Sequence, residues 1–83
     1  MHVPTVNERI RHAQALIASG DKKAAATELT DAAVECRDPI DAAEIRQLAE
    51  REMDAAGRFG KGRWKEIIRI ADLHGAGAGT AMR

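Results

Sequence analysis

One stretch decides how this chain folds: Gly57-Arg-Phe-Gly-Lys-Gly-Arg-Trp-Lys-Glu-Ile-Ile-Arg-Ile-Ala-Asp-Leu-His-Gly75. It contains both aromatic residues of the sequence, Phe59 and Trp64, and the densest run of large aliphatic side chains. The segments before it are rich in alanine and carry thin apolar stripes, which need a bulkier surface to pack on. We therefore expect the helical half of this stretch to anchor the core.

The composition of the chain predicts an all-α fold. Eighty-three residues make one small domain, and 17 of them are alanine, the best helix former. Tyrosine is absent, and the β-branched residues Val and Thr, which favour strands, are few. The alanine content also leaves a modest core, so we expect either marginal stability or a partner, which includes a second copy of the chain.

The charges and the single thiol indicate a cytoplasmic protein without a general attraction to polyanions. Thirteen basic and thirteen acidic side chains cancel, so any affinity for nucleic acid or anionic lipid must be local. One cysteine, Cys36, excludes an internal disulfide and fits a reducing compartment. No apolar run approaches the roughly 18 residues of a membrane span, and the first residues lack the features of a secretory signal.

The first helix is predicted over residues 6–19, after a loose lead-in at 1–5. Thr5 and Glu8 have the spacing of a capping box, in which each side chain satisfies a free backbone N–H group. Gly20 can adopt the left-handed conformation that ends a helix. The apolar stripe of this helix consists of Val6, Ile10, Ala13 and Ile17, with Leu16 beside it.

Two further helices are predicted over residues 22–36 and 39–56. Asp21 is suited to cap the first of them, and Pro39 to the first position of the second. The apolar stripe of helix 22–36 is formed mostly by small residues, which allow a neighbouring helix to approach closely. We expect residues 6–19 and 22–36 to form a helical hairpin.

The last helix is predicted over residues 62–74, so that residues 6–74 form one domain of two successive helical hairpins. Glycines interrupt the loop before it. After it, residues 75–83 alternate glycine with alanine and show no periodicity, which predicts a disordered C-terminal tail.

The first hairpin resembles a tetratricopeptide repeat. Gly20-Asp21, Ala25, Leu29 and Ala32 are similar to the turn and the small and large positions in the second half of such a repeat, and Ala13 and Leu16 suit the helix before it. The resemblance covers about one repeat, residues 9–39. It implies that the two hairpins pack as tetratricopeptide-like helix pairs.

The apolar residues of helix 62–74 cover more than half of its circumference, so this helix is either buried on two sides or exposes an apolar patch. On a domain this small, such a patch predicts a non-catalytic interaction or self-association module that binds a partner helix, a peptide or a second protomer. The predicted partner-binding residues are Trp64, Ile67, Ile68, Ile70 and Leu73.

An alternative function is suggested by the basic, glycine-rich loop before this helix. It predicts an anion or nucleic-acid contact through Arg58, Lys61, Arg63 and Lys65, with the two aromatic rings available to stack on bases. Two features oppose this alternative. Trp64 has the spacing of a core residue, and the acidic side chains of helix 39–56 are expected to neutralise much of the loop's charge.

No enzyme activity, metal or cofactor is predicted. The imidazoles of His2, His12 and His74 and the thiol of Cys36 do not stand at metal-ligand spacing, and Cys36 lies on a stripe of packed small residues. The carboxylates of helix 39–56 have the spacing of any exposed helix, and no nucleophile, base and orienting acid occur in a recognisable order.

Overall fold

The computed structural model describes residues 3–57 and 60–76, and within them every regular element is helical. The all-α prediction is therefore confirmed. The elements, in chain order, are α1 (Val6–Ala18), α2 (Lys22–Glu35), α3 (Pro39–Ala56), α4 (Lys61–Ala71) and a π-helical turn, Asp72–Ala76, that continues α4.

Side-chain caps begin the first three helices where the sequence predicts them. The Thr5 hydroxyl accepts the N–H of Glu8 at 3.1 Å, and the Thr5 N–H donates to the Glu8 carboxylate at 2.8 Å, which completes the capping box. Asp21 and Asp38 each accept a backbone N–H of the first turn of α2 and α3, at 3.2 and 3.0 Å. Pro39 occupies the first position of α3, as expected.

The C-terminal boundary differs from the prediction. Helical turns continue through Ala76 and do not stop at residue 74, so Gly75 and Ala76 belong to the helix and not to the tail. A tertiary contact links the start of this turn to α3: Arg46 donates to the Asp72 carboxylate at 3.1 Å. The rest of the predicted disordered tail, residues 77–83, lies outside the described residues.

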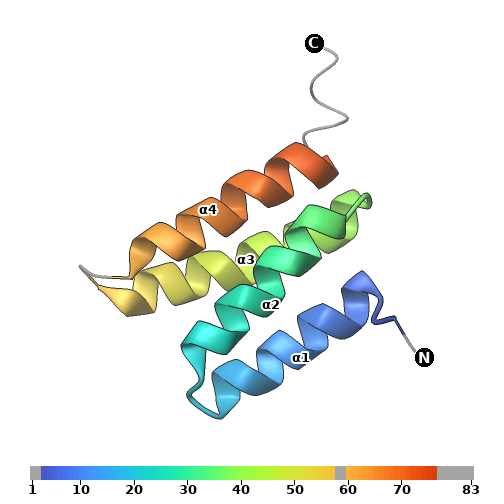
Figure 1. Cartoon of the computed structure of the whole chain (residues 1–83). Helices are drawn as coiled ribbons and strands as arrows, with labels where there is room; N and C mark the ends of the chain where they lie inside the picture. Colours follow the sequence, from blue (N-terminus) through green and yellow to red (C-terminus); the bar gives the residue numbers. More distant parts are fainter. Residues whose placement is uncertain (1–2, 58–59, 77–83) are drawn as a thin grey trace.

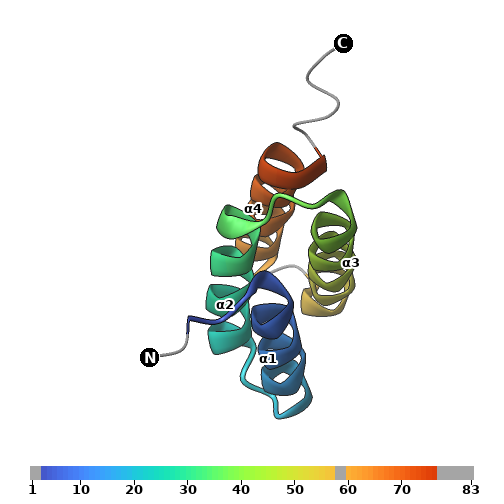
Figure 2. The same cartoon turned by 90° about the vertical axis from the view of Figure 1, so that its right-hand side faces the viewer.

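The four helices form two antiparallel hairpins, α1 with α2 and α3 with α4, as predicted. The hairpins join mainly through α2, which packs alongside α4, whereas α1 and α3 contact each other only slightly. Figure 2 shows the resulting layers, with α2 and α4 in one and α1 and α3 in the other. The likeness to a tetratricopeptide repeat stays a prediction, because two packed hairpins are not specific to that family.

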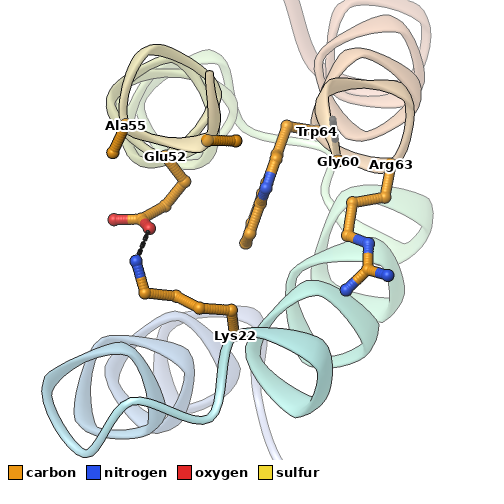
Figure 3. Close-up of a pocket in the computed structure, with 7 residues that line it drawn as sticks. Lys22, Glu52, Ala55, Gly60, Arg63 and Trp64 are labelled. Atoms are coloured by element: carbon orange, nitrogen blue, oxygen red, sulfur yellow. Dashed lines mark hydrogen bonds and ion pairs between the residues drawn. The ribbon is translucent and has the colours of Figure 1, made fainter. Parts of the chain in front are cut away.

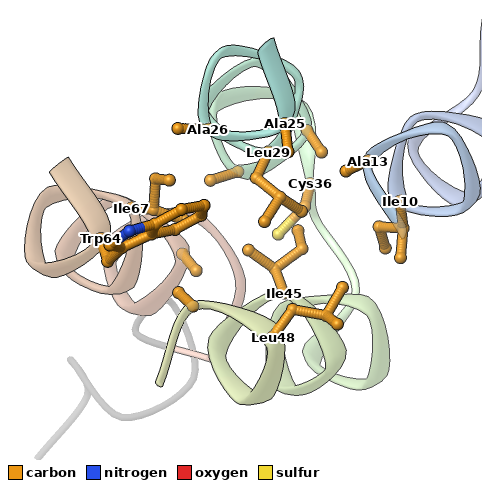
Figure 4. Packing of buried hydrophobic residues seen from close by; sticks show 14 of the residues in the cluster. Ile10, Ala13, Ala25, Ala26, Leu29, Cys36, Ile45, Leu48, Trp64 and Ile67 are labelled. Carbon is orange, nitrogen blue, oxygen red and sulfur yellow. The ribbon is translucent and has the colours of Figure 1, made fainter. Parts of the chain in front are cut away.

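Alanine allows the helices to approach closely around a few large side chains. Trp64 inserts from α4 beside Ile67, and Leu29 and Ile45 meet them from α2 and α3 (Figure 4). Trp64 is only 3% exposed, which confirms its expected role as a core anchor. Of the fifteen buried hydrophobic residues in the described part of the chain, eight are alanine: Ala13, Ala25, Ala26, Ala32, Ala33, Ala42, Ala49 and Ala71.

Candidate functional site

The predicted partner-binding residues of α4 divide between the core and the surface. Trp64 and Ile67 are buried, while Ile68 and Ile70 are partly buried and pack against the core. Of the five, Leu73 alone is exposed, with 59% of its surface accessible. The prediction is corrected for Trp64 and Ile67, because α2 and α3 cover the wide apolar stripe of α4 on two sides.

Three of the four exposed large aliphatic side chains of residues 3–57 and 60–76 lie instead on helix ends at one end of the bundle. Val34 lies in the last turn of α2, Ile40 in the first turn of α3 and Leu73 in the turn after α4; they are 45%, 75% and 59% exposed. The turn that carries Leu73 contacts both α2 and α3. Figures 1 and 2 show these three helix ends together, on the side opposite the loops that close the hairpins. We call Val34, Ile40 and Leu73 the apolar end.

Sequence reasoning missed Val34 and Ile40, although a signal was present. Both stand outside the apolar stripes of their helices, and a large aliphatic side chain on a polar face is left for solvent or a partner. The same end also carries charges of both signs. Arg37 donates to the backbone carbonyls of Val34 and Cys36 and has no carboxylate within ion-pair distance among the described residues.

The basic residues of α4 are not neutralised by α3, which corrects that expectation. Among the described residues, no carboxylate lies within ion-pair distance of Lys61, Arg63 or Lys65; Arg58 lies outside those residues. Two of the five acidic side chains of α3 have other partners: Glu52 pairs with Lys22 of α2 at 2.5 Å, and Glu50 pairs with Arg46 of α3 itself at 3.1 Å.

Helical spacing also separates these cations from one another. Lys61 and Lys65, four residues apart, share one face of α4, whereas Arg63 projects from the other side. Arg63 lines a pocket of about 290 Å³ where the first turns of α2 and α4 meet the last turn of α3. The apolar wall of this pocket is made by Trp64, Ala55 and Ala56.

The polar groups of this pocket lie on both sides of the tryptophan. Figure 3 shows the indole between the Lys22–Glu52 ion pair and Arg63. Gly60 begins α4 in the left-handed conformation, with φ 85°, and no side chain caps the helix. The first N–H groups of α4 therefore lack the carboxylate that α2 and α3 each place at this position.

A second polar cluster joins α1 to α2. Arg9 of α1 lies 3.4 Å from Glu28, 3.4 Å from Glu35 and 3.6 Å from Asp31, all on one side of α2. Its Nε is buried and lacks hydrogen-bonding geometry although the Glu35 carboxylate is near. His12 lies 3.6 Å from Glu28. The arrangement is that of a structural clamp, because one guanidinium neutralises carboxylates that would otherwise repel one another.

The described residues contain neither an activated thiol nor a cluster of metal-ligand side chains. Cys36 is buried, and burial followed by the nearby charge of Asp41 raises the pKa of its thiol, which disfavours the reactive thiolate. Within residues 3–57 and 60–76, no three His, Cys, Asp or Glu side chains are placed to share a metal ion. No helix in that part of the chain is both long and apolar enough to cross a membrane.

Because comparisons with known proteins found no match, any function must be inferred from the fold and from these sites. The chain matches no protein-family model, no curated protein and no solved structure.

Proposed function

We propose that this protein is a small, non-catalytic interaction module that self-associates through the apolar end. The observation that supports the proposal is that three exposed aliphatic side chains, from three different elements, lie on helix ends at one end of a small bundle. Small soluble domains rarely keep apolar side chains together at the surface unless a partner covers them. The surface retains Leu73 from the predicted site and adds Val34 and Ile40.

The charges around the apolar end favour a second copy of the chain over a partner helix or peptide. Arg37 lies there without a carboxylate partner, and Asp41 in the first turns of α3 is acidic and makes no ion pair within the described residues. In a two-fold dimer the same patch faces itself, so a surface that carries both signs can pair Arg37 with an acidic residue of the other copy.

The test is the oligomeric state of a double variant, Ile40→Gln with Leu73→Gln, measured by sedimentation velocity over a range of concentrations. We expect the wild-type chain to dimerise and the variant to weaken the dimer by about tenfold or more, since each change removes apolar surface from the contact. Thermal unfolding should change little, because both side chains are exposed.

Gln47→Lys, at an exposed position in the middle of α3, is the matched control and should dimerise like the wild type. A wild-type chain that stays monomeric at millimolar concentration would contradict self-association. A double variant that dimerises normally would show that the contact lies elsewhere.

The second function that we propose is nucleic-acid binding through Lys61, Arg63 and Lys65. The observation in its favour is that no described carboxylate neutralises these cations. It ranks below self-association because Arg63 projects away from the face shared by the two lysines.

Fluorescence anisotropy with single-stranded and duplex oligonucleotides tests the second proposal. Binding should weaken steeply with salt and should be lost when all three cations are changed to glutamine, whereas Arg11→Gln on α1 should have little effect. No binding to any oligonucleotide at low salt would remove this function.

A further inference from the structure

We infer that the pocket beside Trp64 is a binding site for a small anion with a flat apolar body, such as an aromatic carboxylate. The pocket lies at the end of the bundle opposite the apolar end, so the inference is independent of self-association. It goes beyond the basic loop predicted from the sequence, because it assigns Arg63 to a surface pocket and leaves Lys61 and Lys65 outside it.

The pocket supplies donors without matching acceptors. Lys22 is already paired with Glu52 at 2.5 Å, but the Arg63 guanidinium has no carboxylate partner among the described residues. The N–H groups at the start of α4 are not capped by a side chain. Within the described residues, the site therefore retains one positive charge without a carboxylate partner and N–H groups that no side chain caps, and an anion would satisfy both.

Trp64 adds a hydrogen-bond donor to the residues that line the pocket. The residue is 97% removed from solvent, yet its indole N–H has no hydrogen-bond acceptor among residues 3–57 and 60–76, and this nitrogen is not sealed from solvent. A tryptophan N–H in a core usually finds an acceptor. Since this ring forms a wall of the pocket, a ligand there can bring an acceptor close to the indole.

The shape and size of the pocket indicate that the ligand has a flat, apolar body beside its negative charge. The indole, Ala55 and Ala56 make an apolar wall, against which a flat ring can pack. A planar carboxylate matches the fork of a guanidinium better than a spherical anion does. The volume of about 290 Å³ restricts the ligand to a small molecule.

Trp64 is the single tryptophan of the chain, so its fluorescence reports on the site directly. Benzoate is the probe, and benzamide, which has the same shape without the charge, is its matched control. We expect benzoate to change the emission saturably, with a dissociation constant of about 1 mM or below, and benzamide to bind at least about tenfold more weakly. Sodium chloride at the same ionic strength should not produce the saturable change in emission.

Variants of α4 assign the site. Arg63→Gln should weaken benzoate binding about tenfold or more, Arg63→Lys less, and Lys65→Gln, an exposed cation of the same helix outside the pocket, not at all. Arg63 is exposed, and unfolding followed by circular dichroism checks that each variant folds. A second readout is the backbone N–H resonances of Gly60 and Arg63, which should shift with benzoate.

Three results would overturn the inference. They are no saturable response to benzoate in either readout, equal binding of benzoate and benzamide, and an Arg63→Gln variant that binds as tightly as the wild type. The last two would exclude recognition of charge by this pocket even if an aromatic ring enters it.

Discussion

At the scale of single residues, the two core side chains that carry a polar or reactive group, Trp64 and Cys36, are both buried. Trp64 fills the space that alanine leaves between α2, α3 and α4, and its ring also lines a pocket. Cys36 is buried where α2 ends, with the acidic side chains of Asp38 and Asp41 nearby. Burial and Asp41 raise the pKa of its thiol, and the opposing effects of an Asp38 backbone hydrogen bond and Arg37 are smaller.

The raised pKa of Cys36 predicts a loss of stability in alkaline solution. In the unfolded chain the thiol ionises near its ordinary pKa of 9.0, whereas in the folded protein it resists ionisation. The contribution is therefore fully present below that pH and declines above it, by at most about 1.4 kcal/mol for each pH unit, until the folded thiol also ionises. Urea unfolding between about pH 8 and about pH 10 measures the decline.

Cys36→Ala is the control, because it cannot ionise and leaves only a small gap in the core. Its stability should fall less over the same pH range than that of the wild type. Equal slopes for the two proteins would show that the thiol does not contribute.

At the scale of the elements, the glycines around the second hairpin turn have opposite roles. Gly57 ends α3 with φ 72° and ψ −138°, a conformation that other residues rarely adopt. Gly62 lies within the first turn of α4, with open space where a side chain would start. The backbone conformation therefore requires glycine at position 57, whereas glycine at position 62 weakens α4.

Alanine at the two positions should therefore have effects of opposite sign. We expect Gly57→Ala to destabilise the protein by about 1–3 kcal/mol and Gly62→Ala to stabilise it by about 0.5–1 kcal/mol. Urea unfolding at neutral pH measures both, and each variant is the control for the other. Changes of the same sign would contradict this description of the turn.

The clamp between α1 and α2 gives a second prediction for the elements. Arg9→Ala removes the one guanidinium that faces Glu28, Asp31 and Glu35, and should cost about 1–2 kcal/mol, because the side chains are only partly buried. Arg11→Ala, an exposed arginine of the same helix, should change stability by less than about 0.5 kcal/mol. Chemical denaturation that finds equal effects would rule out the clamp.

The helices could be predicted from the sequence, but the exposed surfaces and the contacts between helices could not. Local signals such as the Thr5–Glu8 box and the glycines after α1 and α3 place the helices within about two residues. The apolar end depends on three helix termini that meet only in the folded chain, and the pairing of Glu52 with Lys22 spans thirty residues. Such contacts depend on tertiary packing, which periodicity does not encode.

At the scale of the whole molecule, the two ends of the bundle differ in character. Because the helices alternate in direction, one end collects Val34, Ile40 and Leu73, and the other collects Lys22, Arg63 and the edge of Trp64. The two proposals therefore concern different ends of the bundle and can be tested separately. Self-association should occupy the first end and leave the second free to take up a small anion.

The most direct test of self-association is to observe the apolar end in the wild-type chain while the concentration changes. Methyl resonances recorded by NMR between about 1 mM and about 10 μM should shift for Ile40 and Leu73, while those of the buried Ile10 and Ile67 and the indole resonance of Trp64 stay in place. Methyl groups of the apolar end that do not respond to dilution, or shifts that appear around Trp64 instead, would contradict it.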